Sequence, residues 1–301
     1  MALILDGKRV RDEILEELKP RIAKLARKPG LVVVLVGNNP ASEVYVGSKV
    51  KTCAELGMVS EKLTPPASIT TEELLQIVAD LNARPEIDGI LVQMPLPKQI
   101  DTQRVLDAIA PDKDVDGFHP TNVGNLSIGR PGPKPCTPSG VMELLKRYEI
   151  TVAGKHAVVV GRSDIVGKPM AMLLLHANAT VTVCHSRTAD LAAECRRADI
   201  LVGAIGRPAM LSRPHMKPGA VLIDVGINRL DNRDEVVKIF GESSEKTAAF
   251  DKRGSVLAGD MHPSDAAELA SAWTPVPGGV GPLTIAMLMV NTVEAAERRQ
   301  S

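Results

Sequence analysis

The sequence has few aromatic residues, which make up 2% of its 301 residues. Its hydrophobic interior must therefore be built from aliphatic side chains and methionine, as is common where helices pack on parallel strands. The apolar share is 44%, and at about 150 residues per domain the length predicts two well-buried domains. Composition thus favours an α/β protein.

The chain also lacks a net charge, because 36 lysines and arginines balance 36 aspartates and glutamates. It has no overall field that would attract nucleic acid or an anionic membrane. No apolar run approaches the roughly 18 residues that span a bilayer, and the apolar stretch after Met1 is too short for a signal peptide. We expect neither a nucleic-acid partner nor membrane association.

Cysteine is scarce as well. The sequence contains Cys53, Cys136, Cys184 and Cys195, with no C-x-x-C pair and no histidine at zinc-binding spacing. This pattern indicates neither a disulfide framework nor a structural metal site. We expect a reduced, cytoplasmic compartment and no bound metal.

One segment combines a tyrosine and a lysine on a predicted helix. In residues 42–57, SEVYVGSKVKTCAELG, the spacing of four places Tyr45, Lys49 and Cys53 on one helical face. One interpretation is an amphipathic edge, where a long cationic side chain lies along apolar surface. The other is a lysine in a partly apolar cleft, where burial disfavours the charged form and suits it to proton transfer.

Aliphatic runs at residues 31–36 and 88–92 predict buried strands in this half of the chain. Gln93 follows the second run directly. In an open α/β sheet, ligands bind at the carboxyl ends of the strands, so Gln93 is a candidate site residue. A glutamine that caps its own loop fits the pattern equally well.

Three aspartates surround a turn in residues 112–120, DKDVDGFHP. Their alternate spacing resembles a calcium loop, but the glycine and the distal glutamate of such a loop are not at the required offsets. Two interpretations remain. The segment is either a solvated turn or the carrier of one aspartate that binds the donors of a ligand.

Residues 129–138 are rich in glycine and proline and predict a crossing into a second domain. A strand at residues 156–160, a glycine turn and an apolar helix follow, which is the arrangement that cradles a pyrophosphate. The spacing departs from G-x-G-x-x-G, so an ordinary βα loop fits too. The candidate cofactor-binding residues of the turn are Gly161, Arg162, Ser163, Val166 and Gly167.

The strand at residues 180–184 is followed by no acidic residue that would hold a ribose 2′-hydroxyl. Ser186 and Arg187 stand there instead, and a hydroxyl with a guanidinium suits a 2′-phosphate. These residues favour NADP over NAD. Later strand ends carry glycines, one of them beside Ile227, which would let a flat cofactor approach the backbone of a Rossmann-like half.

Two further segments differ in character. Residues 230–255 are polar and predict an irregular surface excursion without a chemical role. Residues 273–282, WTPVPGGVGP, predict a constrained loop before a final helix, because glycine and proline together fix an unusual backbone path.

Six motifs occur in order: YVGSK, GILVQMPLP, DKDVDGFHP, GRSDIVGKP, HSRT and PVPGGVGP. Together they resemble the bifunctional methylenetetrahydrofolate dehydrogenase/cyclohydrolase family over almost the whole chain. The resemblance implies NADP-dependent oxidation of 5,10-methylenetetrahydrofolate to 5,10-methenyltetrahydrofolate, then hydrolysis to 10-formyltetrahydrofolate. It further implies a homodimer and a role in one-carbon metabolism and purine biosynthesis.

The resemblance also implies a domain plan and residue roles. A catalytic domain of residues 1–137, completed by a helix at 282–301, would face a Rossmann-like NADP-binding domain of residues 138–281 across a folate cleft. Lys49 is the implied proton-transfer residue of the hydrolysis and Gln93 its assistant. The implied catalytic set is Lys49, Tyr45, Gln93 and Asp116. The implied folate-binding residues are Tyr45, Asp116, Pro277, Gly278 and Gly279.

Three features depart from the family pattern: Leu283 where many relatives have methionine, the run at residues 259–262, and the long connection at 230–255. Two other functions fit parts of the sequence. A different NADP dehydrogenase would leave Tyr45, Lys49 and Gln93 incidental. A non-catalytic dinucleotide or folate sensor would not need the intact Lys49.

Overall fold

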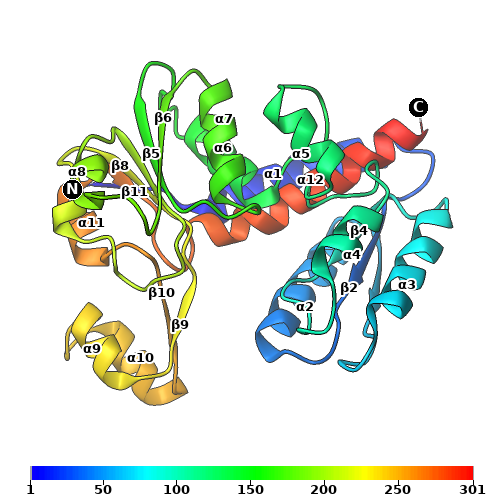
Figure 1. Ribbon diagram of the computed structural model, residues 1–301, viewed down its shortest axis with the longest axis horizontal. Coiled ribbons are helices and arrows are strands. Elements are labelled where there is room, and N and C mark those ends of the chain that lie inside the picture. Colours follow the sequence, from blue (N-terminus) through cyan, green and yellow to red (C-terminus); the bar gives the residue numbers. More distant parts are fainter. Residues whose placement is uncertain (1, 301) are drawn as a thin grey trace. The chain divides into compact units, whose positions relative to one another are not determined.

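The computed structural model describes residues 2–300 and has an α/β architecture (Figure 1). The chain divides into two compact units. The first unit contains Arg11–Cys136 and Ile285–Ser301, and the second contains Met1–Val10 and Thr137–Thr284. Each unit has its own parallel sheet.

The first unit is built on a three-stranded sheet in the order β3-β2-β4. Its strands are β2 (Gly30–Val34), β3 (Val59–Leu63) and β4 (Gly89–Val92), joined by α2 (Pro40–Glu55) and α3 (Thr71–Ala83). Every residue of β2 and β4 is buried, as their aliphatic runs predict. Because the chain reverses direction across the sheet after β3, right-handed crossovers place α2 and α3 on opposite faces.

The remaining helices of this unit are short or shared with the other unit. They are α4 (Thr102–Ala108), α5 (Pro120–Ser127) and the long α1 (Gly7–Ala23) and α12 (Val280–Gln300), whose first residues belong to the second unit. Arg21 on α1 donates to both carboxylate oxygens of Glu297 on α12, at 3.0 and 2.7 Å. The C-terminal helix thus completes the first unit.

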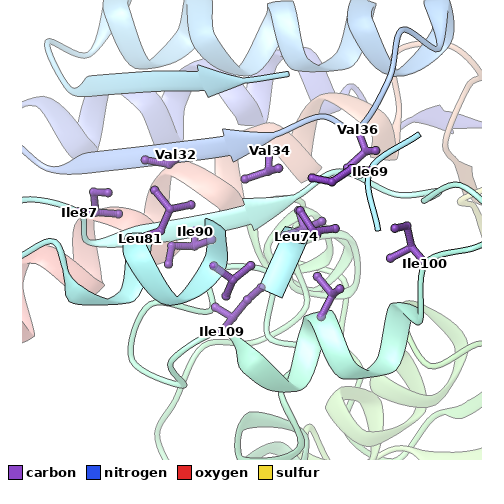
Figure 2. Close-up of a cluster of buried hydrophobic side chains, with 13 residues drawn as sticks. Val32, Val34, Val36, Ile69, Leu74, Leu81, Ile87, Ile90, Ile100 and Ile109 are labelled. Carbon is purple, nitrogen blue, oxygen red and sulfur yellow. The ribbon is translucent and has the colours of Figure 1, made fainter. Parts of the chain in front are cut away.

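The core between β2, β4 and α3 is entirely aliphatic (Figure 2). Val32 and Val34 on β2 pack against Leu74 and Leu81 on α3, and all four are at most 2% exposed. This composition agrees with the scarcity of aromatic residues in the sequence.

The second unit holds a six-stranded parallel sheet in the order β1-β11-β8-β7-β5-β6. Its strands are β1 (Leu3–Ile4), β5 (His156–Val160), β6 (Thr180–Cys184), β7 (Ile200–Gly203), β8 (Val221–Asp224) and β11 (Ala272–Trp273). Its helices include α6 (Cys136–Arg147), α7 (Gly167–His176), α8 (Leu191–Arg196) and α11 (Pro263–Leu269). The strand order reverses between β5 and β7, which creates a ligand-binding crevice at their carboxyl ends in sheets of this kind.

Strand β1 pairs with β11, so the first residues of the chain lie in the sheet of the second unit. The domain plan expected from the sequence placed residues 1–10 with the other domain. Two apolar residues carry no sequence signal for a partner strand about 270 positions away, which is why this pairing emerges only in three dimensions.

Residues 231–255 form a helical hairpin, so the prediction of an irregular excursion was wrong. Helices α9 (Arg233–Phe240) and α10 (Glu245–Arg253) lie side by side at the end of the two-stranded β9 (Asn228–Leu230) and β10 (Val256–Ala258) ribbon (Figure 1). Asn232 and Ser244 cap the two helices. Val236, with Ile239 and Phe240 beside it, packs into a small core that the polar composition conceals.

No helix within residues 2–300 is long and apolar enough to span a lipid bilayer.

Candidate functional site

The carboxyl ends of β2 and β4 form the switch point of the first unit's sheet, where the strand order reverses. Lys49 lies on α2, and Gln93 immediately follows β4. Lys49 Nζ donates a hydrogen bond to Gln93 Oε1 at 2.8 Å, although 44 positions separate the two residues. The fold therefore brings together two residues that the sequence identified separately.

The helical face around Lys49 changes from solvent to core along α2. Tyr45 is 40% exposed, Lys49 is 7% exposed and Cys53 is fully buried. Burial raises the pKa of the Tyr45 hydroxyl, and it raises the pKa of the Cys53 thiol to about 12. Cys53 is thus an inert core residue, whereas Lys49 is a buried cation with a polar partner.

Gln93 uses both ends of its side-chain amide. Nε2 donates to the carbonyl oxygen of Met94 at 2.8 Å, while Oε1 accepts from Lys49. The glutamine therefore caps its own loop, as one interpretation predicted, and its oxygen is turned toward the lysine; its role at a site stays a prediction.

The three aspartates after β4 differ in exposure and in hydrogen-bond partners. Asp112 is exposed and accepts from Arg299 at 2.7 Å. Asp114 is buried and accepts from the N–H groups of Gly117 at 3.0 Å and His119 at 2.8 Å, which fixes the turn. Within residues 2–300 no cluster of histidine, cysteine or carboxylate side chains could hold a metal ion.

Asp116 is the aspartate that couples electrostatically to Lys49. Burial raises the pKa of its carboxyl to about 6; the charge of Lys49 opposes this rise and that of Asp114 adds to it. A partly buried carboxylate near a buried ammonium is suited to bind N–H donors of a ligand.

Two residues that the sequence did not identify hold the Asp116 segment. Cys136 Sγ lies 3.7 Å from Asp116 Oδ1, and Asn291 Nδ2 donates to the carbonyl oxygens of Val115 at 2.7 Å and Lys134 at 3.0 Å. Burial raises the pKa of the Cys136 thiol well above its usual range, so this sulfur is a neutral neighbour. The sequence signal that could have identified Asn291 was its position as a single asparagine within the apolar part of the final helix.

The second unit carries the glycine turn that follows β5. Gly161 has φ +127°, and a Cβ there would lie 2.1 Å from the carbonyl oxygen of Ala204, beyond β7. A Cβ on Gly167 would lie 2.3 Å from Gly161 O. Only glycine fits these approaches, and Ser163 Oγ accepts from the N–H of Val166 and of Gly167 at 3.2 and 3.3 Å. The turn therefore opens onto the positive N-terminal end of α7.

The end of β6 lies beside this turn, because Gly161 N donates to Cys184 O at 2.9 Å. Ser186, Arg187 and, on the turn itself, Arg162 are exposed there. Hydroxyl and guanidinium donors without a carboxylate fit a 2′-phosphate. The residues present thus suit NADP.

Buried carboxylates organise the neighbouring loops. Asp260 accepts from the N–H groups of Ile205 at 2.6 Å, Gly206 at 3.1 Å and Arg207 at 2.9 Å. Asp224 accepts from Asp260 N at 2.9 Å, and burial raises the pKa of its carboxyl to about 7. The sequence marked Asp260 only as part of a departure from the family pattern. Ile227, just beyond β8, is 42% exposed.

Residues 275–279, here called the glycine–proline loop, follow β11. Gly278 has φ +109°, Gly279 N donates to Pro275 O at 2.8 Å, and Gly7 N donates to Gly278 O at 3.0 Å. Pro277 is exposed at the middle of the loop. These bonds hold the unusual path that the sequence predicted.

Comparison with known proteins assigns a family to both halves of the chain. Residues 5–116 match the catalytic domain, and residues 135–300 the NAD(P)-binding domain, of tetrahydrofolate dehydrogenase/cyclohydrolase. The bifunctional protein FolD of Solibacter usitatus is 66% identical and covers 99% of this chain, which covers 99% of that protein.

Solved structures agree. The bifunctional FolD methylenetetrahydrofolate dehydrogenase/cyclohydrolase of Campylobacter jejuni is 44% identical, with a TM-score of 0.90 over 99% of this chain and 100% of that one. The Trypanosoma brucei N5,N10-methylenetetrahydrofolate dehydrogenase-cyclohydrolase, complexed with NADP cofactor and inhibitor, is 38% identical, with a TM-score of 0.88 over 99% and 98% of the two chains.

Proposed function

Because the chain belongs to the tetrahydrofolate dehydrogenase/cyclohydrolase family, we propose that it catalyses both reactions of that family. It oxidises 5,10-methylenetetrahydrofolate to 5,10-methenyltetrahydrofolate with NADP, and then adds water to give 10-formyltetrahydrofolate and a proton. The observation that carries the proposal is the bond from Lys49 to Gln93, beside Asp116, in the part that matches the catalytic domain.

The oxidation depends on placement more than on acid–base groups. The methylene carbon lies between two nitrogens, whose lone pairs stabilise the cation that remains when hydride departs. NADP, when bound, accepts that hydride. We propose that Asp116 accepts hydrogen bonds from the N–H groups of the pterin ring, because its carboxylate is shielded from solvent. We propose that Tyr45 orients the folate, because its ring is half exposed.

The hydrolysis requires protons to move. Water adds to the methenyl carbon and loses a proton; cleavage of the bond from that carbon to N5 then needs a proton on the departing nitrogen. We assign this transfer to Lys49, because Gln93 Oε1 holds its Nζ and the side chain is almost fully buried. Pro277, Gly278 and Gly279 form the loop that closes over the folate.

The glycine turn and the end of β6 are the proposed NADP site. Gly161, Gly167 and the N-terminus of α7 would hold the pyrophosphate, with Arg162, Ser163, Val166 and Ile227 around the cofactor. Arg187 and Ser186 would take the 2′-phosphate. An Arg187→Ala variant should weaken NADP binding by about 10-fold or more and leave NAD binding unchanged, as calorimetry can measure. Arg253→Ala, at an exposed arginine on α10, is the matched control.

The family assignment also suggests domain roles, a compartment and an oligomeric state for this protein. Apart from residues 1–10, which lie in the second unit, residues 1–137 with 282–301 would serve the folate; residues 138–281, apart from the glycine–proline loop, would serve the cofactor. A cytoplasmic homodimer is expected, in which 10-formyltetrahydrofolate supplies formyl groups for purine biosynthesis. The four cysteines are free and buried, which supports a reduced compartment. Light scattering of the purified protein measures the oligomeric state.

The test is an assay of purified protein with 5,10-methylenetetrahydrofolate and NADP. The methenyl product should appear by its absorbance and then decay as 10-formyltetrahydrofolate forms. An assay in which no methenyl absorbance develops and no 10-formyl product accumulates contradicts the proposal. Folate binding by calorimetry then separates a different NADP dehydrogenase from a non-catalytic folate sensor.

A further inference from the structure

The helical hairpin of residues 231–255 contacts the glycine–proline loop through one lysine. Lys246 Nζ, from the first turn of α10, donates to the carbonyl oxygens of Leu257 at 2.8 Å and Val276 at 3.1 Å. Leu257 is on β10, which supports the hairpin, whereas Val276 is in the loop itself, next to Pro277. One ammonium group therefore connects the hairpin, its strand and the loop.

This position is unfavourable for a lysine unless its contacts compensate. The first turn of a helix is the positive end of its dipole, which opposes a cation. Burial also lowers the pKa of Lys246, because it disfavours the charged form. The two carbonyl oxygens offset these costs together with the ring of Phe240, whose centroid lies 5.3 Å from Nζ.

The hairpin holds the lysine in a defined place. Ser244 Oγ accepts from Thr247 N at 3.1 Å, and Thr247, which is 1% exposed, donates from Oγ1 to Gly241 O at 2.7 Å. Phe240 and Val276 line the same cavity of about 20 Å³, which has room for about one water molecule. The hairpin and the start of the loop thus border one small cavity, and the Lys246 hydrogen bond to Val276 joins them.

We propose that Lys246 is a positioning residue for the glycine–proline loop: it holds the Val276 carbonyl and so fixes Pro277 and Gly278 for the folate. What the loop binds rests on the proposed function, whereas the bracing of the loop does not. The polar segment, for which the sequence predicted no role, then takes part in substrate binding through the loop that it braces.

Hydrogen exchange tests the bracing without any substrate. In a Lys246→Met variant, which keeps the apolar stem and removes the donors, we expect the amides of Gly279 and Gly7, which donate to Pro275 O and Gly278 O, to exchange about tenfold faster than in the wild type. Lys246→Arg should restore much of the protection, because a guanidinium also donates to carbonyl oxygens. Lys252→Met, at an exposed lysine on the same helix, should exchange like the wild type. Unchanged exchange in Lys246→Met overturns the proposal.

Kinetics test the effect on substrate. In Lys246→Met the KM for 5,10-methylenetetrahydrofolate should rise about tenfold, while kcat and the Kd for NADP stay within about twofold. A general loss of NADP affinity and of protection throughout the second unit would show mere destabilisation and reject the positioning role. Faster loop exchange with an unchanged folate KM would reject it too. If the wild type does not turn over this substrate, the proposed function fails, and the exchange data still decide the bracing.

Discussion

Two buried lysines in the first unit have different kinds of partner. Lys49 is 7% exposed and donates to the side-chain amide of Gln93, near the carboxylate of Asp116. Lys113 is 2% exposed and donates to three backbone carbonyl oxygens, those of Leu81, Asn82 and Arg84.

The partners, and not the burial, distinguish these lysines. Leu81 and Asn82 are in the last turn of α3 and Arg84 is its C-cap residue, so the charge of Lys113 caps the helix and complements the negative end of the dipole. Burial lowers the pKa of Lys113, so a shifted pKa does not by itself identify a catalytic residue. Lys49 binds a glutamine at the switch point of the sheet, which is where open α/β sheets commonly bind ligands.

The sharpest test of this contrast is Lys49→Met. We expect the cyclohydrolase rate to fall by about 10³-fold, because a positioned proton-transfer group is removed, whereas the dehydrogenase keeps residual activity. The measurement follows methenyl absorbance, which should now accumulate without decay. Equal retention of both activities would show that Lys49 has been assigned the wrong role.

Lys113→Met should produce the converse result. Three carbonyl oxygens lose their donor, so the free energy of unfolding should fall by about 2–4 kcal/mol while activity per folded molecule is kept. Denaturant titration measures the loss, with Lys98→Met at an exposed lysine as control. An unchanged free energy of unfolding in Lys113→Met would show that Lys113 does not stabilise the fold.

Gln93→Ala tests whether the amide orients Lys49. Loss of a hydrogen bond to a charged group should lower the cyclohydrolase rate by about 10-fold and change the dehydrogenase less. Gln99→Ala is the matched control, since Gln99 donates only to the loop carbonyls of Ala67 and Ile69 in the described contacts. A cyclohydrolase that is equally slow in both variants would point to a loop effect.

The smallest expected effect concerns the pH dependence of stability. Folding raises the pKa of the Asp116 carboxyl from 3.8 to about 6. Between these pH values the native protein holds a proton that the unfolded chain has released. The wild type therefore loses stability as pH rises between about 4 and 6, and Asp116→Asn lacks this loss. The midpoint of Asp116→Asn relative to the wild type should be about 2 °C higher at pH 7 than at pH 5. Asp224, present in both proteins, cancels in this difference, and parallel curves would contradict the assignment.

Much of the local structure could be predicted from the sequence. The aliphatic runs gave β2, β4 and β5, and the glycines at positions 161 and 167 marked a turn that only glycine can form. The helix expected at residues 42–57 is confirmed, since α2 spans Pro40–Glu55. The hairpin at 231–255 was missed, because its helices are short and their apolar faces cover each other.

The sequence by itself determined the α/β class, the family and the chemistry of the candidate side chains, because these depend on composition and on patterns within a few adjacent residues. Tertiary structure alone decided which buried lysine meets an amide, which of three neighbouring aspartates is left near it, and how Lys246 reaches Val276. These pairs are 44 positions apart for Lys49 and Gln93, 67 for Lys49 and Asp116, and 30 for Lys246 and Val276. They depend on strand order and on the path of the connections, which local periodicity does not contain.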